Sequence, residues 1–162
     1  MLFRSDSILV SGNPAPNDTY TIISVLDTGN ITAFKLEVLA DPRLPNRGPG
    51  RHSSGDFVLS ELVLEAIPEK PGESHHVPIS QVWASFAAKN QPIRNVTDGD
   101  PATGWQVRGR IGKPHTAVFV LSEPIVSDGK TRLSVRLQHD GDLGPGIGKF
   151  RLAVTSDLPP GN

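Results

Sequence analysis

Cysteine is absent from this chain of 162 residues. Its absence excludes a disulfide framework, a thiolate zinc site, a catalytic cysteine and a covalently attached c-type haem within the chain. It does not assign a compartment, since exported bacterial domains can also lack cysteine. An exported domain without disulfides needs another way to fasten its loops, and a bound metal ion is one candidate.

The chain also lacks an apolar run long enough to span a membrane, and its N-terminal residues are not those expected of a signal peptide. The segment Met1–Ser5 is typical of a domain boundary, and Leu158–Asn162, with its two prolines, is typical of a linker. We therefore predict one module over residues 1–157 and a linker over residues 158–162. We expect both to be part of a longer exported protein that is periplasmic or extracellular.

Neither sign of charge dominates the composition, because 16 Lys and Arg face 17 Asp and Glu and the net charge is −1. A chain with this balance has no long-range positive field to attract nucleic acid or an anionic membrane. We therefore expect neither as a partner.

Long helices are not expected, because the chain contains 16 Gly and 15 Pro and little helical periodicity. Short β-forming segments recur between turn signals instead, and Thr131–Leu137 alternates cleanly, with Leu133, Val135 and Leu137 on the inward side. This pattern predicts an all-β antiparallel β-sandwich or jelly roll. The predicted strands are Tyr20–Val25, Ile31–Leu39, Phe57–Leu64, Thr116–Leu121, Arg132–Leu137 and Phe150–Val154. A short helical turn near Trp83–Ala88 is an option, and Glu69–His76 is interpreted as a plain linker.

Two long irregular segments, Asp41–Asp56 and Lys89–Pro114, carry most of the polar chemistry. Irregular segments of this length in a compact domain are often functional. The second contains Asp98-Gly99-Asp100-Pro101-Ala102-Thr103-Gly104-Trp105. The carboxylates of Asp98 and Asp100 with the Thr103 hydroxyl suit a hard cation such as Ca²⁺, and Gly99 permits a tight turn. From the spacing alone, an Asx-type surface turn is the more common interpretation of such a segment.

DGDPATGW resembles the D-G-D-x-x-T-x-W loop of discoidin-like domains, also called factor five/eight type C domains, which include many carbohydrate-binding modules. The resemblance implies a galactose-binding-domain-like sandwich with a structural Ca²⁺ held by the Asp, the Thr and main-chain carbonyls. In that family a Glu from the last strand completes the site. The matching pattern here, Phe57–Leu64 with Glu61, precedes the Asp loop, so we expect a permuted strand order in which Glu61 meets Asp98, Asp100 and Thr103.

A longer series of segments covers most of the chain: ITAFKLEVLADPRLPNRGPGR, FVLSELVLEA, DGDPATGW, GKPHTAVFVLSEP and GKFRLAVT. In this order they resemble a module that accompanies c-type cytochrome domains in large planctomycete proteins. That resemblance implies a sandwich module of an exported multidomain protein, with any haem in another domain, and it implies no particular ligand.

Sugar-binding sandwiches use an aromatic platform and a few polar groups. Trp83 is a candidate platform if Val82, Ala84 and Phe86 face inward, whereas Trp105 is expected in the core. Arginine can hold a sugar hydroxyl, a sulfate or a uronate, and each of the polar candidates can equally be a solvated loop residue. These candidates are Arg51, His52, Lys89, Asn90, Arg108 and Arg110.

No nucleophile elbow occurs, and the carboxylates cannot be assigned to an opposed catalytic pair. We therefore expect a non-catalytic carbohydrate-binding module with structural Ca²⁺, which targets a larger exported protein to a polysaccharide or oligosaccharide. The alternative is a ligand-free spacer that packs against neighbouring domains of the longer chain.

Overall fold

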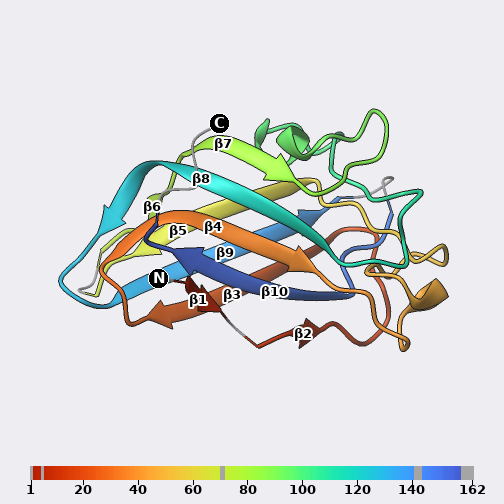
Figure 1. Cartoon of the computed structure of the whole chain (residues 1–162), viewed down its shortest axis with the longest axis horizontal. Coiled ribbons are helices and arrows are strands. Elements are labelled where there is room, and N and C mark those ends of the chain that lie inside the picture. The colour runs from red at the N-terminus through yellow and green to blue at the C-terminus, as the bar shows by residue number, and fades with distance from the viewer. Residues whose placement is uncertain (1, 5, 70–71, 141–143, 158–162) are drawn as a thin grey trace.

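The computed structural model describes residues 2–4, 6–69, 72–140 and 144–157, which fold into two antiparallel sheets packed face to face (Figure 1). This confirms the predicted all-β antiparallel sandwich. The segment 158–162, predicted to be a linker, lies outside the described residues.

Sheet A has six strands in the described part of the chain, in the order β1-β10-β4-β8-β7, with β2 also paired to β10. Sheet B has four in the same residues, in the order β3-β9-β5-β6. The strands of sheet A are β1 (Leu2–Arg4), β2 (Ile8–Leu9), β4 (Asn30–Val38), β7 (Ile79–Ala84), β8 (His115–Val126) and β10 (Lys149–Thr155). Those of sheet B are β3 (Asp18–Leu26), β5 (Glu61–Ile67), β6 (His75–His76) and β9 (Thr131–His139). Two 3₁₀ helices, η1 (Pro45–Arg47) and η2 (Ile93–Thr97), lie in the connections.

Alternating side chains build the core between the sheets. In β9, Leu133, Val135 and Leu137 are buried, as the alternation predicts, while Arg132 and Arg136 are on the outer face. Each fully buried aliphatic or aromatic side chain contributes about 1.5–3 kcal/mol, so this interface is the main source of stability.

Three local predictions differ from the structure. The predicted strand Phe57–Leu64 becomes regular only at Glu61, because residues 57–60 turn toward the Asp loop, where Leu59 forms an isolated bridge with Trp105. The predicted linker Glu69–His76 ends in β6, which pairs with β5. Near Trp83 the chain is the strand β7 and not a helical turn.

The connections at the two ends of the sandwich differ in length. At the hairpin end, short turns connect β3 to β4 and β8 to β9, at the left of Figure 1. At the loop end, on the right, lie the long connections after β4 and β7. The segments that the sequence marks as polar and irregular are therefore on one side of the sandwich.

The first and last described strands are neighbours, since Leu2 pairs with Thr155 and Arg4 with Ala153. The described ends of the chain are thus close together, which is the geometry in which a permuted strand order is tolerated. Among the described residues, no helix is long or apolar enough to cross a lipid bilayer.

Candidate functional site

The Asp loop curls around the carboxylate of Asp98 at the loop end. Asp98 follows η2, and its Oδ1 accepts a hydrogen bond from the main-chain N–H of Asp100 at 2.8 Å. Its Oδ2 accepts one from the Thr103 hydroxyl at 2.8 Å. Gly99 has φ of +76°, a conformation that glycine adopts without steric cost. The sequence motif therefore forms a closed turn with Asp98 at its centre.

Glu61, at the start of β5, lies against this turn. The residue is 8% exposed, and its Oε1 is buried without a hydrogen-bond partner among the described residues. Burial raises the pKa of Glu61 to about 7, helped by the negative charge of Asp98 and by a hydrogen bond that protonated Glu61 donates to Asp98. The fold thus brings Glu61 to Asp98, as the resemblance to discoidin-like domains implies.

Asp98 and Asp100 differ in how their charges are held. Burial raises the pKa of Asp98, but hydrogen bonds from the Asp100 N–H and the Thr103 hydroxyl outweigh it and hold the pKa below its usual value. The Oδ1 of Asp100 accepts a hydrogen bond from the Ala102 N–H at 2.9 Å, and its charge also raises the pKa of Glu61. The turn therefore keeps a carboxylate charged beside a second, buried one.

The residues around Asp98 offer oxygen ligands for a hard cation, but they include few carboxylates. A buried carboxylate oxygen without a partner, close to a second carboxylate, is relieved when a cation lies between them. However, in the part of the chain that the structure describes, no three His, Asp or Glu side chains are grouped to hold a metal. Ca²⁺ would therefore be held by Glu61 and Asp98, with Thr103, main-chain carbonyls and water as the remaining oxygen ligands.

Trp105 is a core residue that anchors the Asp loop. It is fully buried, its indole N–H donates to the Phe86 carbonyl at 2.9 Å, and its ring meets Phe57 edge-on at 5.2 Å. It is thus unavailable as a sugar platform, as the sequence suggests.

A second polar feature of the loop end is a small cleft of about 50 Å³ between the two long loops. Asp56 joins the loops, because its Oδ1 accepts hydrogen bonds from the N–H groups of Phe57 at 2.9 Å and Val107 at 3.1 Å. The cleft is lined by His52, Ser54, Asp56, Phe57, Val58, Gln106, Arg108 and Pro145.

Polar groups converge on this cleft from both loops. Arg108 is 78% exposed, with its Nε 4.0 Å from Asp56 Oδ2. His52 is exposed, and its Nδ1 is 2.8 Å from the Ser54 hydroxyl. Gln106 is 7% exposed and lies in the lining of the cleft. A largely buried amide side chain that lines a cleft is a group with which a polar ligand can form hydrogen bonds.

The other candidate ligand-binding residues lie apart from the cleft. Arg51 is buried, donates to the Gly12 carbonyl and lies 3.8 Å from Asp18, so it acts within the protein. The Arg110 guanidinium lies 5.0 Å from the centre of the Phe86 ring. Lys89 and Asn90 are exposed in a turn, where Asn90 has φ of +66°.

Trp83 is 58% exposed and lies on the outer face of sheet A, as the sequence predicts from its inward-facing neighbours. It pairs with Val118, which pairs with Lys35 on the next strand. Trp83 is not among the residues that line the cleft with His52 and Arg108.

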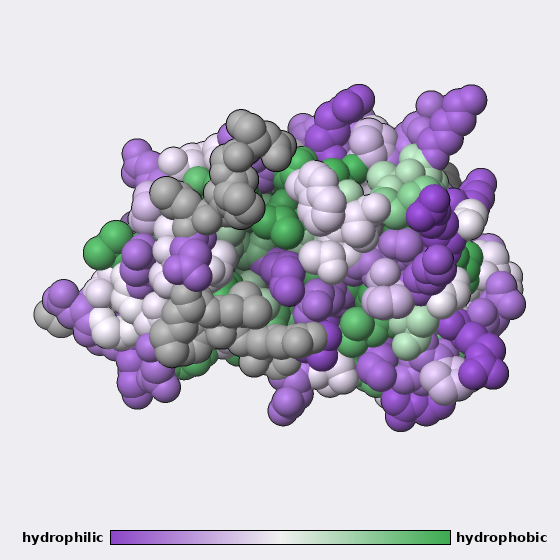
Figure 2. Space-filling view, in the orientation of Figure 1, coloured by the Kyte–Doolittle hydropathy of each residue, from purple (hydrophilic) through white to green (hydrophobic). Residues whose placement is uncertain are grey.

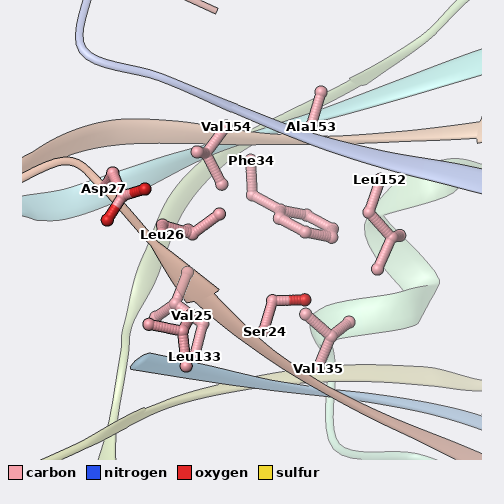
Figure 3. Close-up of a pocket in the computed structure, with 10 residues that line it drawn as sticks. All are labelled: Ser24, Val25, Leu26, Asp27, Phe34, Leu133, Val135, Leu152, Ala153 and Val154. Carbon is pink, nitrogen blue, oxygen red and sulfur yellow. The ribbon is translucent and has the colours of Figure 1, made fainter. Parts of the chain in front are cut away.

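At the hairpin end the sheets leave a cavity of about 320 Å³ that the sequence did not predict (Figure 3). Its lining is mainly apolar, and the Ser24 hydroxyl points into it. Ser24 is the sequence feature that could have indicated this cavity, because it is a small polar residue on the inward side of β3, between Ile22 and Leu26.

Gln106 and Asp56, which shape the polar cleft, were also missed. Gln106 directly follows the Asp-loop motif, and Asp56 ends the first long loop, so position beside a motif was the only signal. Comparison of the chain with protein-family models, with curated proteins and with solved structures found no match.

Proposed function

We propose that the chain is a non-catalytic glycan-binding module, stabilised by Ca²⁺, that attaches a larger exported protein to a polysaccharide. The observation that carries the proposal is the cleft between the two long loops, where the largely buried Gln106 and the exposed side chains of His52 and Arg108 converge. Convergent polar groups at the end of a rigid sandwich suit recognition of sugar hydroxyls.

Ca²⁺ has a structural role in this proposal. Glu61 belongs to sheet B and Asp98 to the loop that follows β7, so one ion fastens a long loop to the sandwich. The chain has no cysteine to do this with a disulfide. Extracellular calcium modules work with dissociation constants of about 10⁻⁴–10⁻³ M, which is compatible with a site of two carboxylates.

The resemblance to discoidin-like domains supports the same function. The Asp-loop motif forms a turn around Asp98, and Glu61 reaches it from β5, an earlier strand. The pairing of β1 with β10 puts the described chain ends together, as a permuted relative requires.

The test is a glycan array followed by affinity electrophoresis in gels that contain soluble polysaccharide, each with Ca²⁺ and with chelator. We expect selective retardation by one polysaccharide family, lost when Gln106 is replaced by Leu and retained in Lys130→Ala, a control at the hairpin end. If a folded sample is retarded by no neutral, sulfated or uronic polymer, the proposal is wrong.

A second function, a spacer that packs against a neighbouring domain, has its own observation. Ile23 and Val25 on β3 are 53% and 62% exposed and lie side by side on the outer face of sheet B, and β3 is at the edge of this sheet. Hydrogen exchange compares the isolated module with a longer protein that contains it. Protection of β3 only in the longer protein favours the spacer, and equal exchange contradicts it.

A further inference from the structure

We propose that the ligand of the cleft is an acidic glycan, whose carboxylate or sulfate groups lie across the segments 45–56 and 107–114. The two segments are named here the basic loop pair. This inference rests on the proposed function, because it specifies the class of polysaccharide for the same site.

The basic loop pair is a single packed surface. The Asp56 carboxylate binds the Val107 N–H at 3.1 Å. The side chain of Ile111 packs on the other loop so closely that a Cβ at Gly48 would lie 2.4 Å from its Cγ2, and one at Gly55 would lie 2.6 Å from it. Residues far apart in the sequence therefore form one fixed surface.

Exposed charge on this surface is of one sign. Asp56 is the only acidic residue of the basic loop pair, and it is 6% exposed and engaged by main-chain N–H groups. Among the residues the structure describes, three of the cations have no carboxylate within ion-pair distance, namely Arg47, Arg110 and Lys113. With Arg108 and His52 they make up the exposed basic side chains of the pair. Hydrophilic side chains cover much of this end of the molecule, at the right of Figure 2.

Both ends of the molecule carry charges of both signs. At the hairpin end the exposed acidic residues Asp27, Glu69, Glu73, Glu123 and Asp128 lie with the exposed cations Lys130 and Arg132, and at the loop end Asp98 and Asp100 are exposed as well. Attraction of an anionic ligand is therefore local to the basic loop pair, whose exposed charged side chains are all cationic.

The cleft within the basic loop pair offers groups that suit an acidic sugar. Arg108 has a planar guanidinium that can bind a carboxylate or sulfate through two hydrogen bonds. The amide of Gln106 can donate to and accept from a ring hydroxyl. His52 carries the one exposed ring among the lining residues, because Phe57 is 1% exposed. Single-stranded nucleic acid stacks successive bases on several aromatic side chains, so this lining favours glycan over nucleic acid.

The loop backbone supports a binding role as well. Asn46 and Arg47 have φ of 49° and 55°, two consecutive non-glycine residues in the left-handed region. Strain of this kind persists only where the surrounding structure holds it, and it is concentrated at binding sites. Asn46 and Arg47 belong to the same loop as His52 and Asp56, which line the cleft.

The experiment compares polysaccharides that differ only in charge. Affinity gels contain polygalacturonate or its methyl ester, and a sulfated galactan or its desulfated form, at physiological salt with Ca²⁺ present. We expect retardation by a charged polymer and not by its neutral partner. Arg108→Ala should weaken the binding about tenfold, as loss of a charged hydrogen bond implies. Lys130→Ala, which removes the same charge at the hairpin end, should change it less than about twofold.

Gln106→Leu distinguishes binding of the sugar in the cleft from general electrostatic attraction of a polyanion, because the substitution removes no charge. We expect it to weaken binding of the acidic polymer while the melting temperature stays close to that of the wild type. Equal binding to charged and neutral members of a pair overturns this inference and leaves the proposed function intact. If folded protein binds none of these polymers and no other glycan, both this inference and the proposed function are wrong. Equal retention by duplex DNA, unaffected by Gln106→Leu, also overturns the inference.

Discussion

The carboxyl of Glu61 on β5 lies against the carboxylate of Asp98 in the loop after β7, and Glu61 Oε1 is buried without a partner among the described residues. Two like charges in partial burial destabilise the fold unless a proton or a cation lies between them. The proposed Ca²⁺ site between these residues would make the stability of the folded state depend on calcium, which gives the first prediction.

Calcium should raise the stability of the wild type and should do little for Asp98→Ala. A ligand that binds only the folded state at a hundredfold excess over its Kd adds about 3 kcal/mol. Thermal melting in Ca²⁺ and in chelator measures the shift for both proteins. Asp128→Ala, which removes an exposed acid at the hairpin end, is the matched control and should keep the full shift. Equal chelator sensitivity in wild type and Asp98→Ala contradicts the site.

Glu61→Gln should have opposite effects in the two buffers. In chelator at pH 8 the wild type keeps an ionised Glu61 beside Asp98, and the neutral amide removes this repulsion, so the variant should be more stable. In Ca²⁺ the variant lacks one ligand charge and should be less stable than the wild type. Urea unfolding at pH 8 in each buffer measures both differences. The same sign in both buffers would show that no cation joins the two residues.

The pairing of Glu61 with Asp98 is expected from the resemblance of Phe57–Leu64 and DGDPATGW to discoidin-like motifs, because neither segment by itself predicts a contact between residues so distant in the sequence. The DGDPATGW turn is predictable from its own residues, since hydrogen bonds within residues 98–103 fix it. The alternation of Leu133, Val135 and Leu137 likewise fixed which side of β9 is inward.

The polar cleft could not be predicted, because contacts distant in the sequence create it. Val107 is held by Asp56, and Arg51 is buried only because Gly12 and Asp18 lie beside it. Residue type alone therefore made Arg51 and Arg108 equivalent candidates, while folding buries one and exposes the other. The cavity beside Ser24 could not be predicted either, because it depends on how the two sheets pack in the folded protein.

His139 should make the fold lose stability in acid. Burial at the end of β9 lowers the pKa of His139 to about 4, although hydrogen bonding to the Asp18 carbonyl opposes the shift. The unfolded chain binds a proton near pH 6.5 and the folded chain only near pH 4, so stability falls as the pH drops through this window. The loss attributable to His139 is about 3 kcal/mol.

Urea unfolding at pH 7 and pH 4.5, in chelator, measures this loss in wild type and in His139→Gln. The variant is destabilised at both pH values, but the change between them should be smaller by an amount that reflects His139. Glu61 titrates in the same window with the opposite sign, since its pKa is raised, and this contribution is common to both proteins and cancels. An identical change in the two proteins rules out a neutral buried His139.

Ser24→Val should stabilise the protein, because Ser24 points into the cavity between the sheets at the hairpin end (Figure 3). Valine replaces the hydroxyl with apolar volume among Leu26, Phe34 and Leu133, and it also favours strand geometry. We expect a gain of about 1 kcal/mol in the free energy of unfolding. Ser134→Val, on the outer face of the neighbouring β9, is the matched control, because it has the same change in β-propensity without filling the cavity. The difference between the two variants, measured by urea unfolding, isolates the packing term. If Ser24→Val gains no more than Ser134→Val, the space beside Ser24 is filled by water that the hydroxyl binds, and the cavity is polar in solution.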